Sequence, residues 1–271
     1  MLNVADVSSN NGADISQIVA NNDAIIVKAT EGDYYTNNLF QTQVKQVQDA
    51  GKRLGLYLFV NGGVTADKQA QYFLDVIGQL SSDDQVPLII DFENRNGVSG
   101  YPILTGNEPK QIADYIYNKT GKKAWLYISN SDLHGGGHNY SWDDMSDYPL
   151  WLAGYPYYDG RAYNADLQKA GDELYFDHLA YWSTVTMWQY DAKPYDRSVF
   201  YGDLSTWDTL AKRVTPQPTL SPVVPNPTPT PLPTPEKPST DDSGDRKELH
   251  MFMDDFLIKV NKAVTDFINR L

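Results

Sequence analysis

The sequence predicts an α/β fold with a mainly parallel sheet, and a β/α barrel is the form of that fold that suits its polar residues. Short apolar segments alternate with helix-like segments through the first 213 residues, an order typical of strands joined by crossover helices. Several of the apolar segments end in polar or charged residues. In α/β barrels the active site lies at the C-terminal ends of the strands, so a barrel would gather these residues at one mouth.

The expected elements follow one another along this region without an internal repeat. We expect strands at residues 4–8, 24–29, 54–60, 86–93, 124–129, 150–153 and 186–190. We expect helices at residues 15–21, 38–50, 65–78 and 108–120, where the apolar residues follow a helical period.

The composition changes abruptly after Arg213. Residues 214–240 hold ten of the chain's sixteen prolines, and a segment of that composition builds neither a strand ladder nor a helix. We therefore expect an extended, semi-rigid linker there. It would separate a large domain, residues 1–213, from a short C-terminal tail, residues 241–271.

The tail predicts a short amphipathic helix. Asp245 and Glu248 stand at the spacing of a capping box. Apolar residues then recur at alternating four- and three-residue steps, at Leu249, Met253, Phe256, Val260, Ala263 and Phe267. A single apolar helix of this length is marginal in water, so we expect it to pack on another surface. Self-association is the interpretation that we favour, and the large domain or a wall or partner surface are the alternatives.

The charge and the cysteine count exclude several classes of function. The net charge is −13, of which residues 1–213 carry −11, whereas proteins that bind nucleic acid present basic patches. The chain has no cysteine, so it has neither a disulfide framework nor a thiolate metal site. The N-terminal MLNVADVSSNNG lacks the basic and apolar regions of a signal peptide, and no apolar run approaches the roughly 20 residues of a transmembrane segment. We therefore expect the protein to be made and held in the cytoplasm.

Two carboxylates end the fourth predicted strand, in PLIIDFE. Residues i and i+2 of a strand point to the same side, so Asp91 and Glu93 can share one pocket. Neighbouring carboxylates in a partly desolvated site repel each other, and one of them keeps its proton to a higher pH. An acid and a base of this kind are what breaks a glycosidic bond. A salt-bridged strand end or a metal site would present the same pair, so the pattern alone leaves these interpretations open.

Other acidic residues follow apolar strands in the same way. Asp6 lies in ADVSSNNG, Glu31 in VKATEG and Asp196 in WQYDAKPYDRS. Acidic positions beyond apolar strands, with aromatic residues nearby, suit a carbohydrate hydrolase. Three of those aromatic residues are candidates to stack on sugar faces: Trp151, Trp188 and Tyr190. Packing in the core is the alternative for each, and taken singly it is the more common role of an aromatic residue.

The segment HGGGH, residues 134–138, has two other interpretations. An HGGG stretch can form the oxyanion hole of an esterase, but that chemistry needs a nucleophile in G-x-S-x-G, which this chain lacks. His134 and His138 are possible metal ligands, although three intervening glycines disfavour a helix that would present them together. We expect a flexible loop over the groove, with no metal site.

Six segments, in this order, resemble family 25 of the glycoside hydrolases, the Chalaropsis-type lysozymes: ADVSSNNG, IIVKATEG, GLYLF, PLIIDFE, LWLAGY and MWQYDAKPYD. The resemblance covers about residues 2–210 and is greatest to muramidases that phages carry as endolysins. No single segment is specific to the family, but the ordered set is.

The resemblance implies an irregular, flattened, TIM-like β/α barrel that acts on peptidoglycan. The reaction would be hydrolysis of the β-1,4 bond between N-acetylmuramic acid and N-acetylglucosamine. Glu93 corresponds to the general acid, and Asp91 to a nucleophile or to a stabiliser of a reacting acetamido group of the substrate. Asp6 and Asp196 correspond to the rest of the acidic cluster. No metal or other cofactor is implied.

The resemblance also implies a substrate groove around these acids. Its expected residues are Lys28, Tyr57, Tyr127, Trp151, Trp188 and Tyr190, with Glu31 as a neighbouring acid that ranks below the other four in the chemistry. Many members of the family have a His after the Tyr of GLYLF, where this chain has Leu58. That departure puts one contact to the substrate in question and leaves the core chemistry in place.

The sequence therefore predicts a bacteriolytic muramidase, a phage or prophage endolysin that lyses a Gram-positive host and is thereby antimicrobial. By analogy with the family, it would wait in the host cytoplasm and reach the wall through holes made by a holin. Two alternatives remain. One is a barrel that binds wall glycan without cutting it, which the presence of both Asp91 and Glu93 disfavours. The other is a hydrolase of chitin or another N-acetylated glycan, whose site chemistry would be nearly the same.

Overall fold

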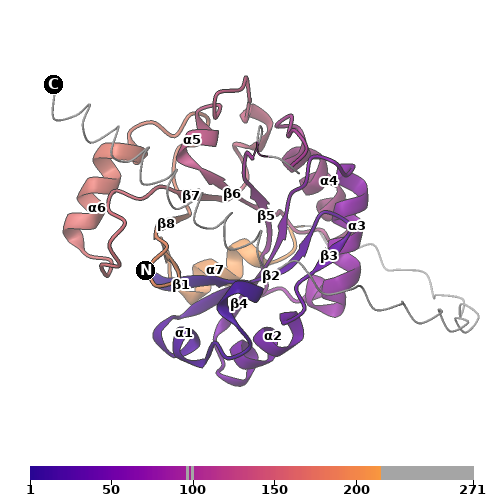
Figure 1. Ribbon diagram of the computed structural model, residues 1–271, viewed down its shortest axis with the longest axis horizontal. Helices are drawn as coiled ribbons and strands as arrows, with labels where there is room; N and C mark the ends of the chain where they lie inside the picture. Colours follow the sequence, from indigo (N-terminus) through magenta and orange to yellow (C-terminus); the bar gives the residue numbers. More distant parts are fainter. Residues whose placement is uncertain (96–97, 99–100, 215–271) are drawn as a thin grey trace, which may run out of the picture. The chain divides into compact units, whose positions relative to one another are not determined.

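An eight-stranded barrel forms the centre of the computed structural model, which describes residues 1–95, 98 and 101–214 (Figure 1). Its strands are β1 (Leu2–Val7), β2 (Ala24–Glu31), β4 (Arg53–Phe59), β5 (Leu88–Phe92), β6 (Trp125–Ser129), β7 (Leu150–Ala153), β8 (Met187–Asp191) and β9 (Asp196–Phe200). The strands from β1 to β8 pair in parallel with their neighbours. The last strand, β9, runs antiparallel to both β8 and β1 and closes the barrel. A two-residue strand, β3 (Tyr35–Thr36), extends the sheet as a hairpin on β2.

Helices cover the outside of the barrel (Figure 1). They are α1 (Ser16–Asn21), α2 (Phe40–Asp49), α3 (Ala66–Ile77), α4 (Glu108–Thr120), α5 (Asn130–Leu133) and α6 (Ala165–Gly171), the last continuing into the π-helical turn Asp172–Phe176. The arrangement is irregular because α5 has only four residues and because a short turn, not a helix, joins β8 to β9. The predicted irregular, TIM-like β/α barrel is confirmed.

The predicted strands and helices are all present, with ends that differ by at most two residues. Strands β3 and β9 and helices α5, α6 and α7 (Leu204–Ala211) were not predicted. Strand β9 begins with Asp196 and Arg197, whose charges conceal a strand that becomes apolar only at its last residues. Apart from Val214, the expected linker and the expected C-terminal helix lie outside the described residues. No helix in the described part of the chain combines the length and the apolar character that crossing a membrane requires.

Strand alternation divides the apolar side chains between two layers. On β4, Leu56 and Leu58 face the helices, whereas Tyr57 and Phe59 face the barrel interior. Leu58 is fully buried in the helix-side layer. The side chain at this position therefore points away from the interior, and the expected loss of a substrate contact through Leu58 is wrong.

Helix α7 closes the amino end of the barrel, where the parallel strands begin (Figure 1). Its Trp207 is fully buried and packs edge-on against Trp125, the first residue of β6, with ring centroids 4.9 Å apart. Phe200, the last residue of the antiparallel β9, stacks on Trp125 at 5.7 Å. The Trp207 indole donates a hydrogen bond of 3.0 Å to the carbonyl oxygen of Gln85. These aromatic residues fill the barrel interior at the amino end, and the acidic side chains that follow the interior-facing residues lie at the opposite end, the carboxyl end of the strands.

Candidate active site

Four carboxylates lie together at the carboxyl end of the barrel, which we call the mouth. Asp6 follows the interior-facing Val4 by two residues on β1, and Asp91 follows the interior-facing Ile89 by two residues on β5. Glu93 comes directly after β5. Asp196 begins the antiparallel β9 and lies opposite Asp6 in the strand pairing.

Burial and mutual repulsion raise the pKa values of the three aspartates. Burial raises the pKa of Asp6 to about 7, against a stabilising hydrogen bond from Gln189 and with further repulsion from Glu93. Burial, followed by the charge of Glu93, raises the pKa of Asp91 well above its usual range. Burial and the charges of Asp6 and Glu93 do the same to Asp196. The four groups are thus close enough to compete for protons, which is the arrangement expected of an acid–base site.

Asp91 is the most enclosed carboxylate of the four. Only 8% of the residue is exposed, and its Oδ1 atom is buried without a hydrogen-bond partner within the described part of the chain. An oxygen in that position loses its hydration without compensation. The arrangement weakens the fold, which is typical of a group kept for function.

Gln189 connects the aromatic side of the mouth to the carboxylates. Its Nε2 donates a hydrogen bond of 2.9 Å to Asp6 Oδ1. Its Oε1 accepts hydrogen bonds from the hydroxyl of Tyr127, at 2.9 Å, and from that of Tyr155. The sequence analysis missed both Gln189 and Tyr155. Strand alternation was the available signal for Gln189, because it lies between two outward-facing aromatic residues of MWQYD.

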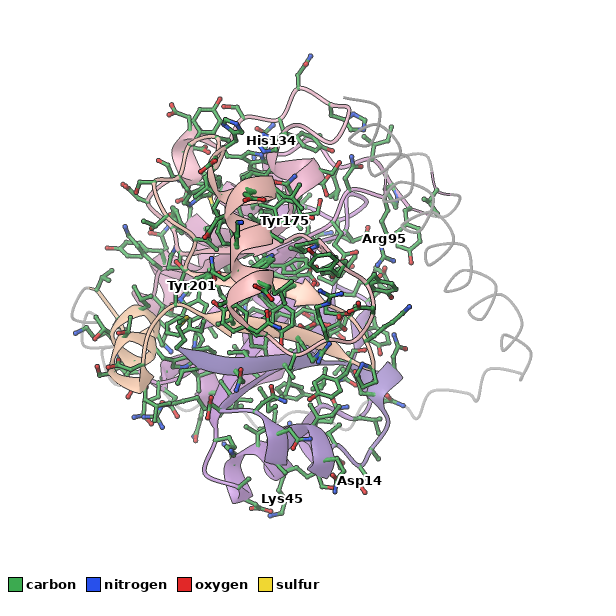
Figure 2. All side chains as sticks on the ribbon, turned by 90° about the vertical axis from the view of Figure 1, so that its left-hand side faces the viewer. Asp14, Lys45, Arg95, His134, Tyr175 and Tyr201 are labelled. Atoms are coloured by element: carbon green, nitrogen blue, oxygen red, sulfur yellow. The ribbon has the colours of Figure 1, made fainter. Side chains whose placement is uncertain are left out.

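Those two aromatic residues, Trp188 and Tyr190, correct the predicted groove. Both belong to a separate apolar cluster on the outer side of the barrel, under α6. Trp188 is fully buried against Phe176, with ring centroids 5.2 Å apart, and its indole donates to the carbonyl oxygen of Gly154 at 2.8 Å. Tyr175, also beside Trp188, is labelled on this side of the molecule in Figure 2. Neither Trp188 nor Tyr190 reaches the mouth.

Three other predicted groove residues, Tyr57, Tyr127 and Trp151, do face the interior. Trp151 is only 2% exposed, packs edge-on against Tyr127, and donates to Ser198 Oγ at 3.1 Å. It forms part of the floor below the acids and has no open face for a sugar. Burial and then the charges of all four carboxylates raise the pKa of Tyr57, so this phenol lies beside the cluster and stays protonated.

Lys28 and Glu31 form a closed pair beside the acids. Lys28 Nζ lies 2.8 Å from Glu31 Oε2 and 4.5 Å from the centroid of the Phe59 ring. The other carboxylate oxygen of Glu31 accepts a hydrogen bond from the hydroxyl of Tyr34 at 3.0 Å. Burial alone would raise the pKa of Glu31, but Lys28 and these hydrogen bonds outweigh it and lower the pKa. Glu31 is therefore held ionised and is unsuited to donate a proton.

Glu93 has a cation of its own, which the sequence analysis did not identify. Arg95 donates from Nη2 to Glu93 Oε2 at 3.0 Å and from Nη1 to the Tyr101 hydroxyl at 2.9 Å. Its guanidinium carbon lies 4.5 Å from the centroid of the Phe59 ring and 4.8 Å from that of Tyr101. Arg95 is labelled in Figure 2. The i, i+2 spacing in ENR was the only sequence signal for this pair.

The HGGGH segment is anchored at the mouth. The backbone N–H of Asn94 donates to Asp132 Oδ2 at 3.1 Å, and the Asn94 side chain donates to the carbonyl oxygen of Gly136 at 3.1 Å. Gly136 has φ of +50°, and a Cβ there would lie 2.2 Å from Asp132 Oδ1, so only glycine fits. The segment is thus an anchored turn beside Glu93 and not the flexible loop that we expected. Within the described residues no group of three or more His, Asp or Glu side chains is placed to hold a metal ion.

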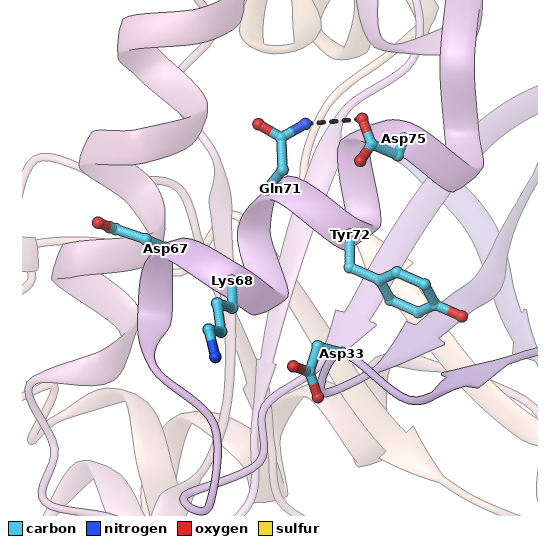
Figure 3. A pocket seen from close by; sticks show the side chains of 6 residues that line it. All are labelled: Asp33, Asp67, Lys68, Gln71, Tyr72 and Asp75. Carbon is cyan, nitrogen blue, oxygen red and sulfur yellow. Dashed lines mark hydrogen bonds between the residues drawn. The ribbon is translucent and has the colours of Figure 1, made fainter. Parts of the chain in front are cut away.

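A second depression lies against helix α3 (Figure 3). It is lined by Asp33, Asp67, Lys68, Gln71, Tyr72 and Asp75. It contains none of the four carboxylates of the mouth, and Gln71 and Asp75 satisfy each other through a hydrogen bond of 2.6 Å. The mouth is therefore the candidate active site.

Comparisons with known proteins agree with this geometry. The sequence model described as Glycosyl hydrolases family 25 matches residues 5–199. The chain is 28% identical over 133 residues to an autolytic lysozyme of Clostridium acetobutylicum. These 133 residues are 49% of this chain and 38% of that protein. The chain spans about half, or less, of the length of the curated relatives it matches.

Two solved structures have a similar fold. A muramidase from Acremonium alcalophilum superposes with a TM-score of 0.60 at 23% identity, over 78% of this chain and 99% of that chain. The modular Cpl-1 endolysin, solved in complex with a peptidoglycan analogue, superposes with a TM-score of 0.55 at 25% identity, over 74% of this chain and 54% of that chain.

Proposed function

The chain belongs to family 25 of the glycosyl hydrolases, and from this premise we propose that it is a muramidase. The reaction is hydrolysis of the β-1,4 bond between N-acetylmuramic acid and N-acetylglucosamine of peptidoglycan. The observation that carries the proposal is the meeting of four mutually repelling carboxylates at the mouth of the barrel. The lysozyme, muramidase and endolysin among the similar proteins, one of them bound to a peptidoglycan analogue, support the choice of substrate.

Glu93 is the general acid in this proposal. It lies just beyond the end of β5, and 30% of its side chain is exposed, so it can reach the glycosidic oxygen of a bound glycan. It gives its proton to that oxygen as the bond to the anomeric carbon breaks. Proton transfer from a positioned side chain contributes typically about 10²–10⁴-fold to the rate.

Asp91 is assigned the role of stabilising the reacting acetamido group of the substrate. Its burial and its raised pKa make it a weak nucleophile, which favours stabilisation over direct attack. The acetamido oxygen then attacks the anomeric carbon as the leaving oxygen takes the proton of Glu93. This attack closes a ring that contains the acetamido oxygen and the anomeric carbon. Water, deprotonated by Glu93, then opens this ring at the anomeric carbon, and the anomeric configuration is retained.

Asp6 and Asp196 complete the acidic cluster around the anomeric centre, and each supplies a negative charge in the fraction of the enzyme in which it is ionised. Fixed charges that face a developing positive charge lower the barrier without reorganisation during the reaction. Gln189 holds Asp6 through its 2.9 Å hydrogen bond, so the charge keeps one position. Lys28, Tyr57 and Tyr127 line the same face of the barrel and bind the substrate or position the acids.

For its biological role, we propose an endolysin of a phage or prophage, released through a holin to act on the wall. The similarity to the Cpl-1 endolysin supports this role. We keep the proposal that residues 241–271 self-associate. Light scattering of the full chain and of a chain ending at residue 213 tests it. The same number of chains per particle for both proteins would contradict it.

The decisive test of the activity is to digest purified cell wall and identify the new reducing ends by mass spectrometry. Muramic acid at the new ends is the expected result, and the Glu93→Gln variant should release none. Glucosamine at the new ends would make the protein a glucosaminidase that uses the same carboxylates. A protein that stays on the wall without producing new ends would be a binding module.

A further inference from the structure

The ion pair between Arg95 and Glu93 opposes the role of Glu93 as the general acid. A general acid must carry a proton, whereas a carboxylate that accepts a hydrogen bond from a guanidinium does so most strongly when it is ionised. Arg95 Nη2 donates to Glu93 Oε2 at 3.0 Å, and an arginine side chain does not lose its charge. The pair therefore has to open before Glu93 can donate a proton to the substrate.

The contacts of Arg95 leave it ready to exchange partners. Its guanidinium rests between the rings of Phe59 and Tyr101 and is bonded to the Tyr101 hydroxyl, so it keeps its place when Glu93 is released. The Arg95 and Glu93 side chains are 25% and 30% exposed, so a ligand can approach both. Arg95 Nε is buried and has no hydrogen-bond partner among the described residues. Nε is out of reach of a ligand, but Nη1 and Nη2 each use one of their two N–H groups in the bonds to Tyr101 and Glu93, so each has one more to donate.

A second ion pair, Arg53 with Asp208, shows what an ion pair built for stability looks like in this chain. Its side chains are 23% and 29% exposed, nearly the same as in the Arg95 pair. Arg53 donates two bonds to its partner, from Nε at 2.7 Å and from Nη2 at 2.8 Å, in the bidentate geometry that suits a carboxylate. Arg95 makes only one bond to Glu93. The difference at equal exposure indicates that the Arg95 pair serves something other than stability.

The surroundings indicate the class of ligand that takes Glu93's place. The domain is strongly acidic, and the charges that face Glu93 in the mouth are Asp6, Asp91, Asp196 and, from α5, Asp132. Lys28, the other cation there, is closed off by Glu31. Arg95 is thus the cation in contact with Glu93, and its Nη1 and Nη2 groups have hydrogens left over for an anionic ligand. The group that fits a guanidinium best is a carboxylate, which the peptide part of peptidoglycan carries and chitin lacks.

We propose that Arg95 is a positioning residue that holds Glu93 in the resting enzyme and transfers its hydrogen bonds to a carboxylate of the wall peptide, which frees Glu93 to act as the acid. This inference rests on the proposed function of the mouth. It makes Arg95 a determinant of specificity as well, because a neutral glycan provides no group that competes for the guanidinium.

The test compares two substrates and two arginine variants. The substrates are soluble wall fragments that carry their peptides and the same fragments after chemical amidation of the carboxylates. Wild-type kcat/KM should fall at least tenfold on the amidated fragments, since a hydrogen bond between charged groups contributes about 1.5–3 kcal/mol. Arg95→Gln should cut both substrates at rates within about twofold of each other. Arg53→Gln, the matched control, should keep the wild-type preference.

The kcat on amidated fragments separates positioning from a purely structural role. Amidated fragments cannot draw Arg95 away from Glu93, so Arg95→Gln, in which Glu93 is already released, should have a higher kcat on them than wild type, whereas a purely structural defect would lower kcat on both substrates. If kcat on amidated fragments does not rise and the preference for charged fragments persists, the proposal is wrong. Arg95→Lys keeps the charge and should retain most of the preference, which covers the case in which Arg95→Gln does not fold. Failure of the muramidase proposal is recognised separately, because wild type would then produce no muramic acid ends.

Discussion

The same strands carry aromatic packing at one end of the barrel and mutually repelling carboxylates at the other. At the amino end, Trp125, Phe200 and Trp207 pack within 6 Å of one another, and Arg53 makes a bidentate pair with Asp208. At the carboxyl end, four carboxylates repel each other, and three of them have raised pKa values. The amino end holds one buried cation, Lys122, whose pKa burial lowers to about 8 and whose Nζ donates to the carbonyl oxygen of Val86, whereas the carboxyl end holds several carboxylates that repel one another.

The distribution of unsatisfied atoms follows the same division. Within the described residues, five buried side-chain atoms have no hydrogen-bond partner: Thr30 Oγ1, Asp91 Oδ1, Arg95 Nε, Asn130 Oδ1 and Arg197 Nε. All five belong to residues at or just beyond the carboxyl ends of parallel strands, or at the start of the antiparallel β9, which lies at the same end. The unpartnered buried atoms are therefore concentrated at the carboxyl end of the barrel, as expected where a site is built for chemistry.

The largest expected effect is at the mouth. Glu93→Gln should lower the rate of wall hydrolysis by about 10³-fold or more, because it removes the transferable proton. Gln keeps the shape and can still accept the hydrogen bond from Arg95, so the melting temperature should stay within a few degrees of wild type. Turbidity loss of wall suspensions measures the rate, and circular dichroism measures the fold. A folded Glu93→Gln variant with near-normal lysis would move the acid to another residue.

The next effect should occur at the amino end and have the opposite character. Trp207→Ala leaves a cavity between Trp125 and Phe200 and should lower the free energy of unfolding by about 3–5 kcal/mol. The mouth lies at the other end of the barrel, so the folded fraction should retain wild-type kcat at low temperature. Urea titration and active-site-normalised rates measure the two quantities, and Trp207→Phe offers a milder cavity. A large fall in kcat with little loss of stability would show that the two ends are coupled.

Asp6→Asn should separate activity from stability within the mouth itself. The hydrogen bond from Gln189 can persist to Asn, but the negative charge is lost, so kcat should fall by about 10–100-fold. The folded pKa of Asp6, about 7, lies above its usual value of 3.8. The folded state therefore binds this proton more tightly than the unfolded state, and wild-type stability falls as pH rises from about 4 through 7.

The Asp6→Asn variant has no carboxyl group at this position, so it does not undergo this fall in stability as pH rises. Asp6→Asn should equal wild type in stability near pH 4 and exceed it by on the order of 1–2 kcal/mol at pH 8, a figure reduced from the full shift because Asp6 is only partly buried. Urea unfolding at several pH values measures the difference. A stability difference that does not change with pH would mean that the Asp6 carboxyl has no raised pKa.

The sequence predicted the barrel strands well because their residues carry the signal locally. Each apolar run of β2, β4 and β5 is bounded by polar or turn-forming residues, and each is buried on both faces. Asp6, Asp91 and Glu93 were found because they follow such runs, and Asp196 was found from its place in the segment MWQYDAKPYD. Strand β9 was missed because its first residues, Asp196 and Arg197, are charged, and its pairing with β1 depends on closure of the barrel, which no local pattern reports.

The side on which aromatic residues lie was harder to predict than their position along the chain. Trp188 and Tyr190 were placed in the groove on their residue type and on the family resemblance, whereas alternation from Met187, an interior residue, would have put Gln189 inside and Trp188 outside. Arg95 was missed for a different reason. It lies beyond its strand, and its contacts with Phe59 and Tyr101 join three segments that only the fold brings together.

The smallest expected effect tests whether the amino end is as independent as the comparison requires. Asp208→Asn removes one charge of a pair whose side chains are 23% and 29% exposed, and exposed ion pairs contribute about 0.2–1 kcal/mol. We expect a loss of stability of that size, diminished in high salt, with unchanged kcat and an unchanged pH profile of wall hydrolysis. Arg53 also begins β4, the strand that carries Tyr57 and Phe59 to the mouth. A shift in the pH profile of Asp208→Asn would therefore mean that strain passes along β4 from one end of the barrel to the other, and the division between the two ends would have to be abandoned.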